Sequence, residues 1–236
     1  MHSESHKLAS KHLKRNILMD DFIMTVNTES EAIKIYHEIQ DLMSRIKLPL
    51  AKSGIKEIWN QNETDFKRES MVLGVNWNTE SDTFNQSIDE ILLNLNGNPA
   101  TKRSLLQSIT KFYDPLGLFA PVLVLGKIMF QDTWFCGIQW DEILPPDIAS
   151  KYNRWSTELS LLKDVKIPRW IGVSNLSNIE FHIFYDASER ANGASIYMRS
   201  TTGNNITVRL VCSRLLSPVK KITLPRLELL SALTGA

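Results

Sequence analysis

The sequence is poor in cysteine, with only Cys136 and Cys212 among 236 residues. Neither belongs to a paired-Cys or Cys/His spacing, so neither a disulfide framework nor a zinc finger is predicted. A long apolar run is also lacking. The longest, residues 115–130, is interrupted by two glycines and a lysine and falls short of the roughly 20 residues that cross a bilayer. We therefore interpret it as a buried helix.

An apolar leader is absent as well, because residues 1–15 are rich in His, Ser and Lys, and secretion is not expected. The sequence contains no Gly-x-Ser-x-Gly elbow, phosphate-binding loop or Asp-Ser/Thr-Gly motif, which argues against serine hydrolases, P-loop enzymes and aspartic proteases. His2 and His6 lie four residues apart, as zinc ligands on a helix do, but no further ligand is nearby and solvated side chains are favoured.

The composition and length fit a globular protein with one large or two small domains, because 43% of the 236 residues are hydrophobic and 22% are charged. The net charge of +1 is unevenly distributed: residues 180–236 hold seven Lys/Arg against four Asp/Glu. A basic segment suits a polyanionic partner, although an excess this small also fits a solvated face.

Local patterns predict the elements of the first half. Two short apolar runs, residues 15–19 and 22–26, flank Asp20 and Asp21, which predicts a hairpin with the acidic pair near its turn. Thr28 and Glu31 form a capping-box pattern that begins a helix. Its apolar positions recur at helical spacing until Pro49: Ile33, Tyr36, Ile39, Met43 and Ile46. Residues 71–77 and 81–84 are predicted to be paired strands.

The second half divides into helices followed by strands. Helices are predicted at residues 101–112, 121–136 and 145–162, with a turn at residues 114–117 between the first two. Alternating segments then predict three antiparallel strands, at residues 180–185, 194–199 and 205–212. A helix with Pro225 in its first turn follows, and its apolar positions are Leu227, Leu229, Leu230, Ala232 and Leu233.

Four carboxylates could carry chemistry. Asp20 and Asp21, at the predicted hairpin, could hold a hard divalent cation such as Mg²⁺, although a solvated acidic turn is the simpler alternative. Asp186 ends a predicted central strand, and Glu228 lies among helix leucines, where an ionised side chain needs a partner unless it faces solvent. A strand-end carboxylate followed by a helix-borne one suits two-metal hydrolysis of a phosphodiester, but a full site needs more acidic ligands.

Several motifs occur in order along the chain. Leu18-Met19-Asp20-Asp21 comes first, and the most distinctive is Phe-Tyr-Asp-Pro-Leu-Gly-Leu-Phe-Ala-Pro-Val at residues 112–122. The others lie at residues 28–32, 72–77, 82–84, 134, 140–142, 144–145, 167–170, 184–188, 193–194 and 224–230. Together these motifs resemble the Bel/Pao-type LTR retrotransposon polyproteins, and the resemblance extends from about Leu13 to Ala236.

The resemblance implies an α/β (α+β) chain in three parts. Residues 1–98 would be the C-terminal part of a reverse transcriptase palm with its following strands, and residues 99–173 a helical, thumb-like connection. Residues 177–236 would be the N-terminal part of a ribonuclease H-like domain, with an incomplete mixed sheet and its first helix. The implied activities are RNA-directed DNA synthesis and Mg²⁺-dependent hydrolysis of the RNA in RNA/DNA hybrids.

The same resemblance assigns roles to residues. Asp20 and Asp21 match the polymerase metal pair, and Asp186 and Glu228 match the first two catalytic carboxylates of the nuclease, with Mg²⁺, or Mn²⁺, as cofactor. Leu18 departs from the family pattern, which usually has tyrosine there. The upstream palm aspartate would lie before Met1 and the later nuclease carboxylates after Ala236, so we expect both sites to be incomplete and little turnover from this chain.

The expected partners are an RNA/DNA hybrid or primer-template and the rest of the parent polyprotein. Arg214, Lys220, Lys221 and Arg226 could neutralise phosphates of the nucleic acid, although exposed lysines that serve solubility are an equal alternative. An intracellular location, in a cytoplasmic particle or the nucleus, fits such an element. The rival hypothesis is a non-catalytic nucleic-acid-binding or assembly fragment of a decayed element.

Overall fold

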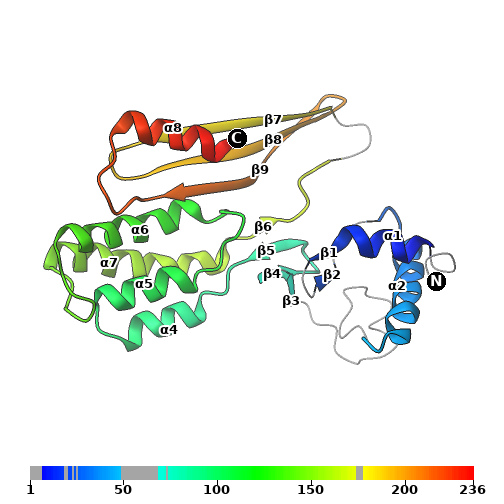
Figure 1. Cartoon of the computed structure of the whole chain (residues 1–236), viewed down its shortest axis with the longest axis horizontal. Helices are drawn as coiled ribbons and strands as arrows, with labels where there is room; N and C mark the ends of the chain where they lie inside the picture. The colour runs from blue at the N-terminus through cyan, green and yellow to red at the C-terminus, as the bar shows by residue number, and fades with distance from the viewer. Residues whose placement is uncertain are drawn as a thin grey trace. The chain divides into compact units, whose positions relative to one another are not determined.

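A computed structural model describes residues 7–18, 21, 22, 24, 26–48, 69–72, 74–173 and 178–236 (Figure 1). The chain forms two compact units, Met1–Leu73 and Gly74–Ala236. Helices and antiparallel sheets are mixed in them, which confirms the predicted α/β class. Among the described residues, no helix is long and apolar enough to span a membrane.

The first unit contains the predicted hairpin. Strands β1 (Ile17–Leu18) and β2 (Asp21–Phe22) are antiparallel, with Leu18 opposite Asp21. The first apolar run was expected to be extended from residue 15, but helix α1 (Lys7–Asn16) continues through Asn16. Strand β3 (Glu69–Val72) ends the described part of this unit.

Helix α2 (Glu29–Arg45) begins where the capping pattern predicts. The Thr28 hydroxyl accepts the backbone N–H of Glu31 at 3.3 Å, and the Glu31 carboxylate accepts from Asn27 rather than from Thr28. The predicted apolar face is partly wrong, because the fully buried residues are Ile35 and Ile39. Burial follows what the helix packs against, here the side chains of Leu13, Phe22, Met24 and Val26, with Met43 of α2 in the same cluster.

The second unit begins with a small antiparallel sheet. Strand β4 (Val75–Asn78) pairs with β5 (Thr83–Asn85), which pairs with β6 (Ile167–Pro168). The Asp82 carboxylate accepts from the Trp77 indole at 2.9 Å and from the Arg169 guanidinium at 2.6 Å. Motifs more than 80 residues apart in sequence therefore meet at one aspartate.

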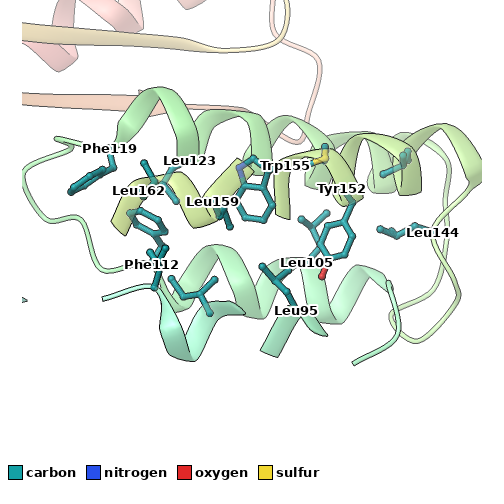
Figure 2. Packing of buried hydrophobic residues seen from close by; sticks show 14 residues of the cluster. Leu95, Leu105, Phe112, Phe119, Leu123, Leu144, Tyr152, Trp155, Leu159 and Leu162 are labelled. Carbon is teal, nitrogen blue, oxygen red and sulfur yellow. The ribbon is translucent and has the colours of Figure 1, made fainter. Parts of the chain in front are cut away.

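Four helices and a 3-10 turn form the main hydrophobic core. The three predicted helices are confirmed as α5 (Lys102–Lys111), α6 (Ala120–Phe135) and α7 (Pro146–Leu159), followed by the 3-10 helix η1 (Ser160–Asp164). Helix α4 (Asp89–Gly97) was not predicted, although Ile88, Ile91 and Leu95 have helical spacing and are buried. Within this core the ring centroids of Tyr152 and Trp155 are 6.4 Å apart and those of Phe112 and Phe119 are 5.6 Å apart (Figure 2).

The predicted three-stranded sheet is confirmed and longer than expected. Its strands are β7 (Asn178–Ala187), β8 (Asn192–Thr202) and β9 (Asn205–Leu216), paired in that order. The expectation that Asp186 ends a central strand is wrong for the described residues, since β7 pairs only with β8 there. Short connections make a meander, and a meander puts the second strand in the middle.

Helix α8 (Leu224–Gly235) lies along β7 and β8 (Figure 1). Its buried residues are Leu227, Ser231 and Gly235, whereas Leu229 and Leu233 are each 71% exposed. The predicted leucine stripe is therefore largely not the packing face. A side chain at Gly235 would place its Cβ 2.7 Å from a methyl group of Ile183, so the close approach of helix and sheet requires small residues.

The distinctive turn of residues 114–117 attaches the helices to this sheet. The Asp114 carboxylate accepts the N–H groups of Leu118 and Phe119, each at 2.8 Å, and so stabilises the turn that leads into α6. The Leu116 carbonyl accepts the Ser213 N–H at 2.8 Å, and the Ser213 hydroxyl donates to the Gly117 carbonyl. The turn therefore pairs with strand β9 while it starts the next helix.

Candidate functional site

Asp186 lies at the end of β7, next to the turn that leads into β8. Its side chain is exposed, and its Oδ1 accepts the N–H of Ala187 at 2.8 Å. Its carbonyl oxygen accepts the hydroxyl of Ser231, on α8, at 2.7 Å. An outward-facing carboxylate is thus carried on a backbone that α8 fixes.

Glu228 lies one helical turn before Ser231 on α8 and is half-buried. Residues three apart on a helix share a face, so Glu228 is on the same side of α8 as the hydroxyl that bonds to Asp186. Leu227, just before Glu228, is fully buried against the sheet. The fold therefore places the helical turn that carries Glu228 beside the end of the strand that carries Asp186.

The donor chemistry of this pair suits a hard cation. Mg²⁺ binds oxygen ligands, commonly one or two carboxylates together with waters and substrate phosphates. In the part of the chain that the structure describes, no group of three or more His, Cys, Asp or Glu side chains could hold a metal. Asp186 and Glu228 could therefore supply two ligands of one ion, while a two-metal site would need more carboxylates.

The predicted metal pair Asp20 and Asp21 lies only partly within the described residues. Asp20 lies outside the described residues, and of Asp21 only the backbone is described, in β2 opposite Leu18. The polymerase role of this pair stays a prediction.

The four basic residues predicted to contact nucleic acid are all exposed. Arg214 is on β9, Lys220 and Lys221 are between β9 and α8, and Arg226 is in the first turn of α8. Arg214 is opposite Ala194, which is opposite Tyr185, the neighbour of Asp186. Of the four, Arg214 therefore belongs to the cross-strand row next to the candidate carboxylate.

Three residues near this site were missed by the sequence reasoning. Gln131 and Asp132, on α6, contact Arg190 in the turn that follows Asp186. Gln131 is 2% exposed, and a polar residue that ends a long apolar helix run was the available signal. Nothing in the sequence indicated its distant partner.

A three-stranded antiparallel sheet, with a carboxylate at a strand end and a helix packed across it, is compatible with the ribonuclease H-like class. A sequence model of the family described as "Pao retrotransposon-like RNaseH-like domain" matches residues 101–236. Because the match covers more than half of the chain, the chain belongs to this family. A search of curated proteins found no match.

The family match includes α5, α6 and α7 together with the sheet. The match shows that this part of the chain is related to retrotransposon ribonuclease H. The assignments of residues 1–98 to a polymerase palm, of residues 99–173 to a connection and of residues 177–236 to the nuclease stay predictions.

Proposed function

We propose that this chain carries the first two metal-binding carboxylates of a retrotransposon ribonuclease H, Asp186 and Glu228, and that the parent protein hydrolyses the RNA strand of RNA/DNA hybrids. The observation that carries the proposal is the hydrogen bond from Ser231 to the Asp186 carbonyl, because it brings the helix of Glu228 to the strand end of Asp186. The family match supports the same reaction class.

In this proposal each group has a definite role. Asp186 and Glu228 ligate Mg²⁺ through their carboxylate oxygens, and a bound Mg²⁺ would activate water and stabilise the leaving oxygen. Arg214 and Arg226, both exposed, contact phosphates and hold the hybrid in place without selecting sequence. Further carboxylate ligands would have to come from the parent polyprotein.

Metal binding is the sharpest test, because it does not require a complete active site. Free Mn²⁺ would be titrated with the purified chain and followed by electron paramagnetic resonance. We expect Asp186→Asn and Glu228→Gln each to weaken binding strongly. Glu189→Gln removes an exposed carboxylate three residues from Asp186 and should leave binding unchanged. Equal binding by all three variants and the wild type would overturn the proposal.

Hybrid cleavage tests the reaction itself. A labelled RNA/DNA hybrid would be incubated with the chain and Mg²⁺ or Mn²⁺, with Asp186→Asn as the control. We expect slow cleavage at most, abolished by the substitution. Cleavage that persists in Asp186→Asn would assign the activity elsewhere.

A non-catalytic nucleic-acid-binding role is the second candidate, favoured by the four exposed basic residues around α8. It predicts hybrid binding without cleavage at any metal concentration. Replacing Lys220 and Lys221 by glutamate should then weaken binding in fluorescence anisotropy and reduce the dependence of affinity on salt.

The polymerase activity implied for the parent protein depends on Asp20 and Asp21. Primer extension by a polyprotein that includes the preceding palm sequence should be lost in Asp20→Asn. Extension that survives this change would remove these residues from the catalytic set.

A further inference from the structure

The turn between β7 and β8 is held by a helix of the preceding core. Arg190, in this turn, donates through Nε to the Gln131 side-chain oxygen at 2.8 Å. Its Nη2 forms an ion pair with Asp132 and a longer hydrogen bond, 3.4 Å, to the Ile128 carbonyl. All three acceptors are on α6, so the guanidinium attaches the turn that follows Asp186 to that helix.

Gln131 also makes a second connection. Its amide nitrogen donates to the carbonyl of Pro218 at 2.5 Å and to that of Arg190 at 3.4 Å, while the Ser217 hydroxyl donates to the Arg190 carbonyl at 2.9 Å. Ser217 and Pro218 begin the segment that leads from β9 into α8. One nearly buried amide therefore joins the turn after Asp186 to the segment that precedes the helix of Glu228.

The ion pair between Asp132 and Arg190 is partly shielded from solvent. The Asp132 side chain is 17% exposed, and among the described residues its ion-pair partners are Arg190 and the Lys151 ammonium, the latter at 3.9 Å. Removing one member of a partly buried ion pair leaves the other with unfavourable desolvation. The turn also has internal bonds, from the Ser188 N–H and hydroxyl to the Ala191 carbonyl, so it moves as a unit.

We propose that Gln131, Asp132 and Arg190 are positioning residues that set the spacing between Asp186 and Glu228. This inference rests on the function proposed above and extends it: helix α6 shapes the metal site although it contributes no ligand. Residues that orient metal ligands from outside the coordination shell typically change metal affinity by about 10- to 100-fold when they are replaced.

The main test variant is Asp132→Asn, which keeps the shape of the side chain and removes its charge. We expect faster amide hydrogen exchange at residues 187–191 and Mn²⁺ affinity reduced by about 10-fold or more. Arg190→Lys, which keeps a charge for Asp132 but loses the contact with Gln131, should have an intermediate affinity. It also provides a second variant if Asp132→Asn does not fold.

Two controls separate positioning from general stability. Lys151→Met removes the weaker partner of Asp132 and should leave Mn²⁺ affinity unchanged. Leu105→Ala destabilises the helical core from a fully buried position on α5, whereas the Arg190 guanidinium bonds to α6. It should lower the melting temperature without changing Mn²⁺ affinity, measured where the variant is folded.

The outcomes are distinct for the two proposals. If Asp186→Asn abolishes Mn²⁺ binding and both Asp132→Asn and Arg190→Lys bind as the wild type does, positioning is refuted and the proposed function stands. If Mn²⁺ affinity does not respond to Asp186→Asn, the proposed function fails and the positioning role fails with it.

Discussion

Replacing Gly117 by alanine should break the contact between the turn of residues 114–117 and strand β9. Gly117 has φ +67°, and an added Cβ would lie 1.8 Å from the carbonyl oxygen of Ser213. Because backbone cannot rotate away as a side-chain tip can, the turn and the strand must separate. That separation removes the two hydrogen bonds that Ser213 donates to Leu116 and Gly117.

The expected change in the free energy of unfolding can be estimated from the backbone strain and the lost hydrogen bonds. A left-handed backbone costs a residue with a Cβ about 1–2 kcal/mol, and each lost hydrogen bond costs about 0.5–1.5 kcal/mol net. We therefore expect Gly117→Ala to lower the free energy of unfolding by about 2–5 kcal/mol. Gly203 has φ +58° and nothing within 4 Å of its added Cβ. Gly203→Ala should therefore cost only about 1–2 kcal/mol for the left-handed backbone.

Urea unfolding of both variants, followed by tryptophan fluorescence, measures the difference. If Gly117→Ala and Gly203→Ala agree within about 0.5 kcal/mol, the extra cost of the β9 contact is absent. Such agreement would refute the close packing of Gly117 against Ser213.

Two further predictions concern Asp114 and helix α8. Burial raises the pKa of Asp114 above its ordinary 3.8, against the opposing effect of the N–H groups of Leu118 and Phe119. The folded chain therefore binds this proton more tightly, and the contribution of Asp114 to stability falls as pH rises above 3.8. The stability of the wild type relative to Asp114→Asn should decrease over that range in urea titrations, and an increase would mean that the N–H donors dominate. Leu227→Ala, at a fully buried site, should cost about 2–5 kcal/mol. Leu229→Ala, at a site 71% exposed, should change stability by less than about 0.5 kcal/mol in the same assay, and equal losses would contradict the orientation of α8.

Local signals in the sequence determined most of the elements. Thr28 and Glu31 predicted the start of α2, Pro225 lies in the first turn of α8, and alternation predicted the strands of the three-stranded sheet. Each signal acts over a few residues, through capping bonds, proline geometry or side-chain periodicity. The residue types at Asp186 and Glu228 were equally visible, because a carboxylate after an apolar strand or among leucines is unusual.

Only the tertiary structure decided which faces and which distant residues meet. The hydrophobic pattern of α8 predicted that its leucines face the sheet, but Ser231 and Gly235 are buried there together with Leu227. Close contact between a helix and a sheet depends on the side-chain volumes of both surfaces. The bond from Ser231 to Asp186 spans 45 residues and the ion pair of Arg190 with Asp132 spans 58. Such pairs leave no periodic trace in a single sequence, since they depend on how whole elements pack.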